Sequence, residues 1–352
     1  MKKGITKVVA VGIDVGDKNS QVCAKDGTGA VVWEKKVKTT EAGFRGALGK
    51  LPPCRIVIEA GGQTRWIKGR LEALGHEVKV ADPRKLRRIF QSESKSDLRD
   101  ARELAEEALW RWDRMSSVTL RSRESQEKLA VLKARDALVR TRTGLINLVR
   151  SVLKQEGVVV RKGASEAFPK HAGPVVPEGL RPALDPVLSQ IGMLTGQIGR
   201  YDHWIEKAGA REGAIRLLRT PAGVGPVTSA AFVWTLDDAA RFAKSRTVGA
   251  FLGMRPRRDQ SGDSDKQLPI TKTGNAFLRR LLVGSAQYIL GPFGPDTALR
   301  AWGLKLAGRG GKRAKRRAVV AVARKLSVIL HRMWVTGEVY QPFPERAHAL
   351  VG

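Results

Sequence analysis

The chain has 352 residues, with 64 Lys and Arg against 34 Asp and Glu, so its formal net charge at pH 7 is +30. Its 42% of hydrophobic residues is enough for a buried core, which excludes global disorder. No apolar run reaches the roughly 18 residues of a membrane span. An excess of cations this large predicts a polyanionic partner, because each neutralised phosphate releases counterions. Nucleic acid fits better than an anionic membrane surface.

The first hundred residues predict a mixed sheet covered by helices. The expected elements are strands at 7–13, 20–26 and 30–37, a helix at 40–50, a strand at 54–60, a helix at 64–74, a strand at 77–83 and a helix at 97–112. Tight turns join the first three strands, and helical crossovers join the later ones. This order, β-β-β-α-β-α-β followed by a helix, is typical of ribonuclease-H-like (RuvC-like) folds, an α/β class.

The remainder predicts a mostly helical structure. Leucines at helical spacing indicate a long helix at 120–157 and a second at 183–208, joined by a Gly/Pro-rich connector at 158–181. Two such helices suggest an antiparallel coiled-coil arm, either a spacer or an element for oligomerisation or nucleic-acid binding. The domains expected are therefore 1–118, 119–208 and 209–352.

Four carboxylates of the first domain are candidate metal ligands. Asp14 ends the first strand and Glu59 ends the fourth, and these strands are neighbours in a sheet of this kind. Asp97 and Asp100 are spaced i, i+3 and share one helix face. Four carboxylates this close require cations, and Mg²⁺ prefers oxygen ligands. Two such ions about 4 Å apart can clamp both oxygens of a phosphoryl transfer.

Each carboxylate also has an ordinary structural explanation. Asp14 could cap a turn with Asn19, and Glu59 could pair with Arg65. Asp97 could be a helix N-cap, with Asp100 favoured by the helix dipole. The four together favour a metal site, because they fall in the topological order that brings them to one edge.

A serine among arginines is the second candidate site. Arg255, Arg257 and Arg258 precede Asp259-Gln260-Ser261-Gly262. A serine beside cations can attack phosphorus while the cations stabilise the developing charge. The same letters are also those of a polar loop.

Further basic residues and glycines predict contacts with a nucleic-acid backbone. The turn Gly223-Val224-Gly225-Pro226 precedes a helix at 228–234 and leaves backbone N–H groups suited to phosphate, in the manner of a helix-hairpin-helix segment. Residues 300–325 hold ten Lys or Arg and no acid, and we expect 308–317 to be flexible. A third region is the turn Thr273-Gly274-Asn275, which follows Lys272 and precedes a helix with Arg279 and Arg280. The candidate backbone-binding residues are Arg255, Arg257, Arg258, Lys272, Arg279, Arg280, Lys312, Arg313, Lys315, Arg316 and Arg317.

Three blocks of the first domain, GIDVGDKNS, VIEA and KSDLRDARELA, resemble those of the DEDD transposases of the "IS one-ten" insertion sequences. Three later blocks, LLRTPAGVGPVTSAAFV, FAKSRTVGAFLGMRPRRDQSG and ITKTGNAFLRRLLVGSA, resemble the C-terminal transposase domain of the same family. The resemblance covers roughly residues 8–340.

The resemblance implies a DNA transposase or recombinase with Mg²⁺ or Mn²⁺ on Asp14, Glu59, Asp97 and Asp100. It implies that Ser261 is a nucleophile that forms a phosphoserine–DNA intermediate, with Ser264 as the second candidate. The implied partners are donor and target DNA, an element-encoded bridge RNA, and further copies of the chain in a dimer or tetramer with shared active sites. The implied location is the bacterial cytoplasm, at the nucleoid and not in a membrane. Two alternatives remain open, a metal-dependent endonuclease or junction resolvase that uses water, and a non-enzymatic nucleic-acid scaffold.

Overall fold

A computed structural model describes residues 8–82, 97–115, 117–261 and 264–343 of the chain. The chain divides into two compact units, Met1–Leu120 and Arg121–Gly352. Separate hydrophobic clusters lie within each unit. The three-domain division expected from the sequence remains a prediction. No helix in the described part of the chain is long and apolar enough to cross a lipid bilayer.

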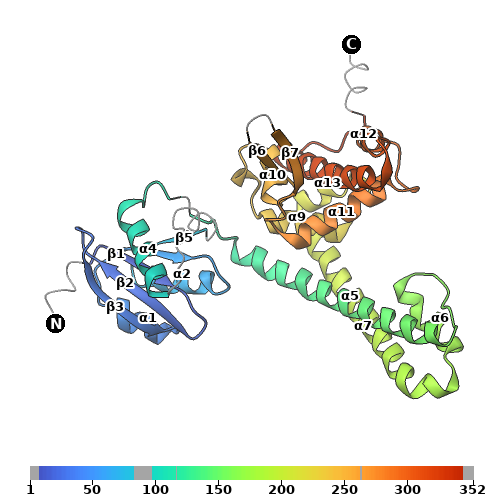
Figure 1. The fold of residues 1–352 in the computed structure, drawn as a ribbon, viewed down its shortest axis with the longest axis horizontal. Helices are drawn as coiled ribbons and strands as arrows, with labels where there is room; N and C mark the ends of the chain where they lie inside the picture. Colours follow the sequence, from blue (N-terminus) through green and yellow to red (C-terminus); the bar gives the residue numbers. More distant parts are fainter. Residues whose placement is uncertain (1–7, 83–96, 116, 262–263, 344–352) are drawn as a thin grey trace, which may run out of the picture. The chain divides into compact units, whose positions relative to one another are not determined.

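The five strands of the first unit form one mixed sheet in the order β3-β2-β1-β4-β5 (Figure 1). They are β1 (Ala10–Asp14), β2 (Asn19–Lys25), β3 (Val31–Lys38), β4 (Arg55–Glu59) and β5 (Glu77–Ala81). β1 runs antiparallel to β2 and parallel to β4, while β2 pairs antiparallel with β3 and β4 parallel with β5. The predicted order of elements and the mixed sheet are confirmed, and both are consistent with a ribonuclease-H-like fold.

Helices cover both faces of this sheet because its central strands are apolar on both sides. α1 (Glu41–Leu48) and α2 (Thr64–Ala73) pack on the face that carries Val11, Ile13, Ile56 and Ile58. α4 (Asp97–Trp110) packs on the opposite face, against small residues such as Ala10 and Ala81. Successive side chains of a strand point to opposite faces of the sheet, so alternate residues pack against α4 or against α1 and α2.

Two long helices of the second unit, α5 (Arg123–Gln155) and α7 (Arg181–Ala210), pack against each other in opposite directions (Figure 1). Arg135 of α5 pairs with Asp202 of α7 at 2.5 Å, and Arg142 of α5 donates to Thr195 of α7 at 3.1 Å. A later residue of α5 thus contacts an earlier residue of α7, as in antiparallel packing. The expected antiparallel helix pair is present. Knobs-into-holes packing, which defines a coiled coil, remains a prediction.

The connector between these helices is more ordered than its Gly and Pro content suggests. It contains α6 (Phe168–Ala172) and three short 3₁₀ turns, at Ser165–Ala167, Gly173–Val175 and Glu178–Leu180. Phe168 and Ala172 are buried against Leu153 and Ile191 of the long helices. Burial of these apolar side chains accounts for the helical turns.

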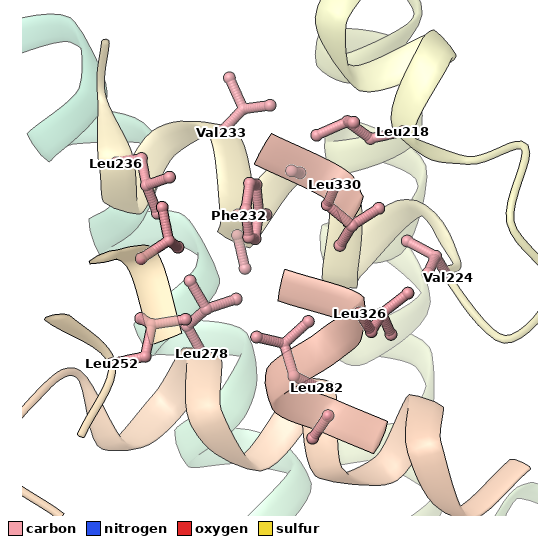
Figure 2. Packing of buried hydrophobic residues seen from close by; sticks show 14 of the residues in the cluster. Leu218, Val224, Phe232, Val233, Leu236, Leu252, Leu278, Leu282, Leu326 and Leu330 are labelled. Carbon is pink, nitrogen blue, oxygen red and sulfur yellow. The ribbon is translucent and has the colours of Figure 1, made fainter. Parts of the chain in front are cut away.

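The main core of the second unit surrounds α9 (Pro226–Leu236), which is buried from Thr228 to Leu236. A helix that is apolar on all sides belongs at the centre of a domain. Figure 2 shows Phe232 of α9 among leucines of the neighbouring helices. The other helices of this part are α8 (Gly213–Leu218), α10 (Arg246–Phe251), α11 (Ala276–Leu290), α12 (Ala298–Ala307) and α13 (Gly311–Thr336).

The segment with the candidate serine forms an antiparallel β-hairpin of β6 (Pro256–Ser261) and β7 (Ser264–Ile270). The expectation of a loop there is wrong for the backbone on both sides of the turn. The two intervening residues, Gly262 and Asp263, lie outside the described residues.

Candidate active site

Asp14 and Glu59 occupy adjacent positions at the carboxyl edge of the sheet. β1 and β4 are parallel, and Ile13 lies opposite Ile58. The next residue of each strand is therefore a carboxylate. Ala10 of β1 and Val57 of β4 face α4. Asp14 follows Ala10 by four residues, and Glu59 follows Val57 by two, so each carboxylate is on the same side of its strand as that residue. The strand alternation places both carboxylates on the α4 face of the sheet.

α4 crosses β1 at Gly12 in direct backbone contact. A Cβ atom on Gly12 would lie 2.1 Å from the carbonyl oxygen of Ala101 and 2.2 Å from the nitrogen of Ala105. No side chain larger than hydrogen fits at this crossing. Gly12 is two residues before Asp14, and Ala101 is one helical turn after Asp97.

The direction of α4 brings its first turn to the same edge as Asp14 and Glu59. Trp112, just beyond the end of α4, lies at the opposite edge of the sheet. Its carbonyl oxygen accepts a 2.5 Å hydrogen bond from Lys79, and the Arg55 guanidinium lies 5.5 Å from its ring centroid. Arg55 is the first residue of β4 and Glu59 the last. α4 therefore runs antiparallel to β4, and Asp97 and Asp100 begin it at the carboxyl edge.

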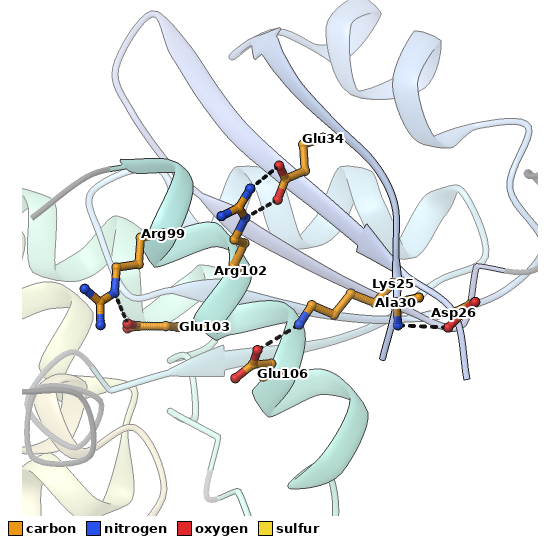
Figure 3. A network of polar contacts seen from close by, with 8 residues as sticks. All are labelled: Lys25, Asp26, Ala30, Glu34, Arg99, Arg102, Glu103 and Glu106. Atoms are coloured by element: carbon orange, nitrogen blue, oxygen red, sulfur yellow. Dashed lines mark hydrogen bonds and ion pairs between the residues drawn. The ribbon is translucent and has the colours of Figure 1, made fainter. Parts of the chain in front are cut away.

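Ion pairs fix α4 across β2 and β3 (Figure 3). Arg102 forms a bidentate pair with Glu34 of β3, at 2.5 and 2.8 Å. Lys25 of β2 pairs with Glu106 at 2.8 Å, and its own side chain is only 7% exposed. The Arg102 hydrogen bond holds the pKa of the Glu34 carboxyl below its ordinary value of 4.5. Bidentate geometry restricts both position and rotation of the helix, so these contacts hold its first turn in place.

The backbone thus brings four carboxylate positions to one edge, while the side chains do not form a closed ligand set. Within the described residues no group of three or more His, Cys, Asp and Glu side chains is arranged to hold a metal ion. Asp97 is exposed, and the other three are partly exposed. The donor chemistry nevertheless suits a hard divalent cation, since all four groups offer carboxylate oxygens. Both cysteines of the chain, Cys23 and Cys54, are buried.

Two of the structural explanations for these carboxylates concern Glu59 and Asp97. No ion pair joins Glu59 to Arg65 among the described residues, and Nε and Nη2 of Arg65 are buried without a hydrogen-bond partner. Asp97 is the first residue of α4. Lys95 and Ser96 of the same sequence block lie outside the described residues.

The hairpin of the second unit places the two candidate serines opposite each other. Ser261 ends β6 and Ser264 begins β7, and their Cα positions are partners in the ladder. Their side chains lie outside the described residues. Arg257 and Arg258 are exposed on β6, and Arg255 is exposed just before it. The hairpin and the carboxylate edge belong to different units of the chain.

The predicted backbone-binding arginines of α11 have contacts within the fold. Arg279 donates to the carbonyl oxygens of Leu252 and Gly274, at 2.8 and 3.4 Å, and so ties α11 to the end of α10. Arg280 pairs with Asp136 of α5 and lies 5.5 Å from the ring centroid of Phe277. Lys272 is exposed, with a left-handed backbone at φ 55°. The role of all three in binding nucleic acid remains a prediction.

Five cations are concentrated in the first two turns of α13, and we call them the α13 basic cluster. All are exposed, and none forms an ion pair within the part of the chain that the structure describes. The expected flexibility of residues 308–317 is wrong from Gly311 onward, because α13 begins there and Lys and Arg are good helix formers. The members of the cluster are Lys312, Arg313, Lys315, Arg316 and Arg317.

Sequence reasoning missed the residues that position the quartet. In the sequence, Gly12 is only a small residue within an apolar strand. In the structure it contacts α4, which follows about ninety positions later in the chain. Glu34 and Arg102 are 68 positions apart, and no local spacing links them. Lys25, an inward-facing charge in a strand, was the one detectable signal, since a buried lysine requires a partner.

Comparison with known proteins defines the class first. A family model of DEDD transposases, described as "Transposase", matches residues 11–157, which include the sheet, α4 and all four carboxylates. A second model, described as "Transposase IS116/IS110/IS902 family", matches residues 215–298, which include α9 and the serine hairpin. The chain belongs to this IS110 family of transposases, enzymes that recombine DNA.

Relatives match along nearly the whole chain. The chain is 29% identical to a transposase for insertion sequence element IS1111A of Coxiella burnetii over 348 residues, covering 97% of this chain and 93% of the relative. It is 27% identical to a probable family 20 transposase of Pseudomonas aeruginosa, covering 94% and 98%. It is 29% identical to a transposase for insertion sequence element IS1328 of Yersinia enterocolitica, covering 80% and 83%.

Proposed function

We propose that Asp14, Glu59, Asp97 and Asp100 hold two Mg²⁺ or Mn²⁺ ions and a scissile DNA phosphate at the carboxyl edge of the sheet. The observation that carries this proposal is the backbone geometry, since strand parity and the direction of α4 direct four acids to one edge. When bound, the ions supply charge stabilisation for the attacking and leaving oxygens. The four carboxylates would orient the phosphate through these cations, whose charge offsets the repulsion among the acids.

Ser261 is the proposed nucleophile. Its hydroxyl oxygen forms a bond to the scissile phosphorus as the bond from phosphorus to the 3′ oxygen breaks. The serine proton is transferred to the departing 3′ oxygen, directly or through solvent, so the products are a phosphoserine and a free 3′-OH. Attack of another strand's 3′-OH on the phosphoserine reverses these bond changes and rejoins DNA. Arg255, Arg257 and Arg258, close in sequence on the same hairpin, supply cations for the charge that develops on phosphorus.

Two further parts of the proposal concern partners. Carboxylates and serine belong to different units, so an oligomer in which one copy supplies the serine to another copy's carboxylates satisfies the chemistry. A bridge RNA supplies sequence choice by base pairing, while the α13 basic cluster contacts backbone phosphates regardless of sequence. Sequencing the RNA that co-purifies with the protein tests this second part: one discrete species supports guided recombination, and a heterogeneous background contradicts it.

Trapping the covalent intermediate tests the nucleophile. Element-end DNA, labelled on the strand that retains the 5′ phosphate, is incubated with protein, guide RNA and Mg²⁺ and then denatured. The expected result is a labelled protein–DNA adduct with the wild type and with Ser264→Ala, and none with Ser261→Ala. Retention of the adduct in Ser261→Ala and its loss in Ser264→Ala would transfer the role to Ser264. Strand cleavage that persists in both variants without an adduct would instead support hydrolysis by water.

A further inference from the structure

A hollow of about 550 Å³ lies beside the N-terminus of α9, entirely within the second unit. One wall is the loop at 219–225, which leads from α8 into α9. The other wall is the face of α11 that carries Arg280, Gly284 and Tyr288. None of the described residues that line this hollow belongs to the carboxylate edge or to the serine hairpin.

Backbone N–H groups at the start of α9 are left without helical partners. Gly223, at φ 82°, makes the turn in which Val224 donates to the carbonyl oxygen of Pro221 at 3.2 Å. Gly225 is the N-cap and offers no capping side chain. The first helical bond of this end runs from the nitrogen of Ser229 to the carbonyl oxygen of Gly225. The N–H groups of the second and third helical residues therefore carry the positive end of the helix dipole without an internal acceptor.

Two largely buried residues that line the same hollow carry hydroxyl groups without partners. Thr228, the third residue of α9, is 8% exposed, and Ser285 of α11 is 4% exposed. Neither hydroxyl has a hydrogen-bond partner within the described residues. Helical serines and threonines commonly satisfy themselves on a carbonyl oxygen one turn back, as Ser229 and Thr195 do here. Two free hydroxyls beside unpaired N–H groups can all donate to one acceptor placed in the hollow.

The charges around the hollow favour an anion. Among the described residues, its lining includes Arg219 and Arg280 and no acid. Arg219 pairs with Glu206 at 2.5 Å, and Arg280 pairs with Asp136. Their side chains remain 35% and 51% exposed, and a guanidinium has five donors, so each pair leaves donors for a second acceptor.

The remaining walls are apolar and match the uncharged part of a nucleotide. Pro221, Ala222 and Leu281 line the hollow, and the ring of Tyr288 is beside them, with the residue 47% exposed. A phosphate or sulfate ion would leave this surface unused. A sugar against the apolar wall and a base stacked on the exposed Tyr288 ring would cover it.

We propose that this hollow binds one nucleotide unit of a nucleic-acid strand, with its phosphodiester at the start of α9 and its sugar and base against α11. The phosphate oxygens accept from the free N–H groups and from the hydroxyls of Thr228 and Ser285. The inference takes from the proposed function only that the ligand is nucleic acid, and it assigns a contact separate from the catalytic residues.

Two variants test the site by different routes. Thr228→Val keeps the shape of the side chain and removes one donor. Gly284→Leu removes no donor and fills the hollow, because a Cβ at Gly284 meets no atom within 4 Å. Gly192→Leu on α7 is the matched control, since Gly192 is also an exposed helical glycine with no atom within 4 Å of a Cβ. Thermal unfolding of all three confirms that they are folded.

Binding is measured by fluorescence anisotropy with full-length protein in EDTA, using one sequence as single-stranded DNA, duplex DNA and RNA. We expect Thr228→Val to raise Kd about tenfold, as for a lost hydrogen bond to a charged group, and Gly284→Leu to raise it at least as much. Gly192→Leu should leave Kd unchanged. The probe whose Kd rises identifies the strand as DNA or RNA. A wild-type Kd in both Thr228→Val and Gly284→Leu, with all three probes, would overturn the proposal. The measurement involves neither metal nor cleavage, so that result is distinct from failure of the catalytic proposal.

Discussion

Replacing Gly12 with alanine places a Cβ atom within 2.1 to 2.7 Å of three backbone atoms of α4, in Ala101, Leu104 and Ala105. Backbone cannot rotate away as a side chain can, so the helix must move off β1. Overpacking of a tight core costs about 1–3 kcal/mol. Replacing a strand glycine recovers about 0.5–1 kcal/mol of conformational entropy. The difference between this cost and this gain gives a net loss of about 2 kcal/mol in the stability of the first unit. This value assumes a cost near the upper end of its range, because all three contacts are with backbone atoms.

The displacement of α4 also predicts a loss of activity with every carboxylate intact. Misplacement of a catalytic group by about 1 Å can cost about 100-fold in rate. Urea unfolding and hydrogen exchange of the β1 and α4 peptides measure the stability, and strand cleavage measures the activity. Gly46→Ala in α1 is the matched control: no atom lies within 4 Å of its Cβ, and it should stabilise the helix by about 0.5–1 kcal/mol. Wild-type stability and cleavage in Gly12→Ala would refute the close approach of α4.

Three further predictions concern charged groups. Replacing the α13 basic cluster with glutamine should reduce the slope of log Kd against log salt by about 0.9 for each duplex phosphate contact removed, and an unchanged slope would contradict backbone binding there. Arg300→Ala should leave that slope unchanged but lower stability by about 2 kcal/mol, because its guanidinium binds the carbonyl oxygens of Ile289 and Gly291, both at 2.6 Å; a changed slope with unchanged stability would reverse this assignment. Folding lowers the pKa of Glu34 from 4.5, so its pair with Arg102 stabilises the first unit above that pH and less as the pH falls through the lowered pKa. Glu34→Gln should therefore destabilise the protein at pH 7 and lose most of this effect in acid, as urea unfolding across pH would show; a pH-independent difference would contradict the pair's role.

The sheet could be predicted because its strands are short apolar runs bounded by turn residues. Asp14 and Glu59 follow directly from that prediction, since each ends such a run and parallel neighbours end at one edge. The approach of α4 could not be predicted in the same way. It depends on a backbone contact at Gly12 and on the pairing of Arg102 with Glu34, both between residues far apart in sequence.

The second unit shows where local patterns mislead. β6 is polar throughout, PRRDQS, so it lacks the apolar alternation of a half-buried strand. Its pairing with β7 consists of the backbone bonds of an antiparallel ladder. The start of α13 was obscured by Gly310 and Gly311, which suggest a break, although Gly311 is the first residue of the helix. The free hydroxyls of Thr228 and Ser285 emerge only when α9 and α11 pack together.

Binding of Mn²⁺ tests the carboxylate quartet most directly, because it requires neither DNA nor the serine. Wild-type protein is titrated with Mn²⁺ and free ion is followed by electron paramagnetic resonance, beside Asp14→Asn, Glu59→Gln, Asp97→Asn and Asp100→Asn. Asp17→Asn is the control, since Asp17 is an exposed carboxylate in the turn after β1. We predict saturable binding in the wild type and in Asp17→Asn, and affinity at least about tenfold weaker in each quartet variant. Equal affinity in all six proteins would contradict a metal site at the edge formed by β1, β4 and α4.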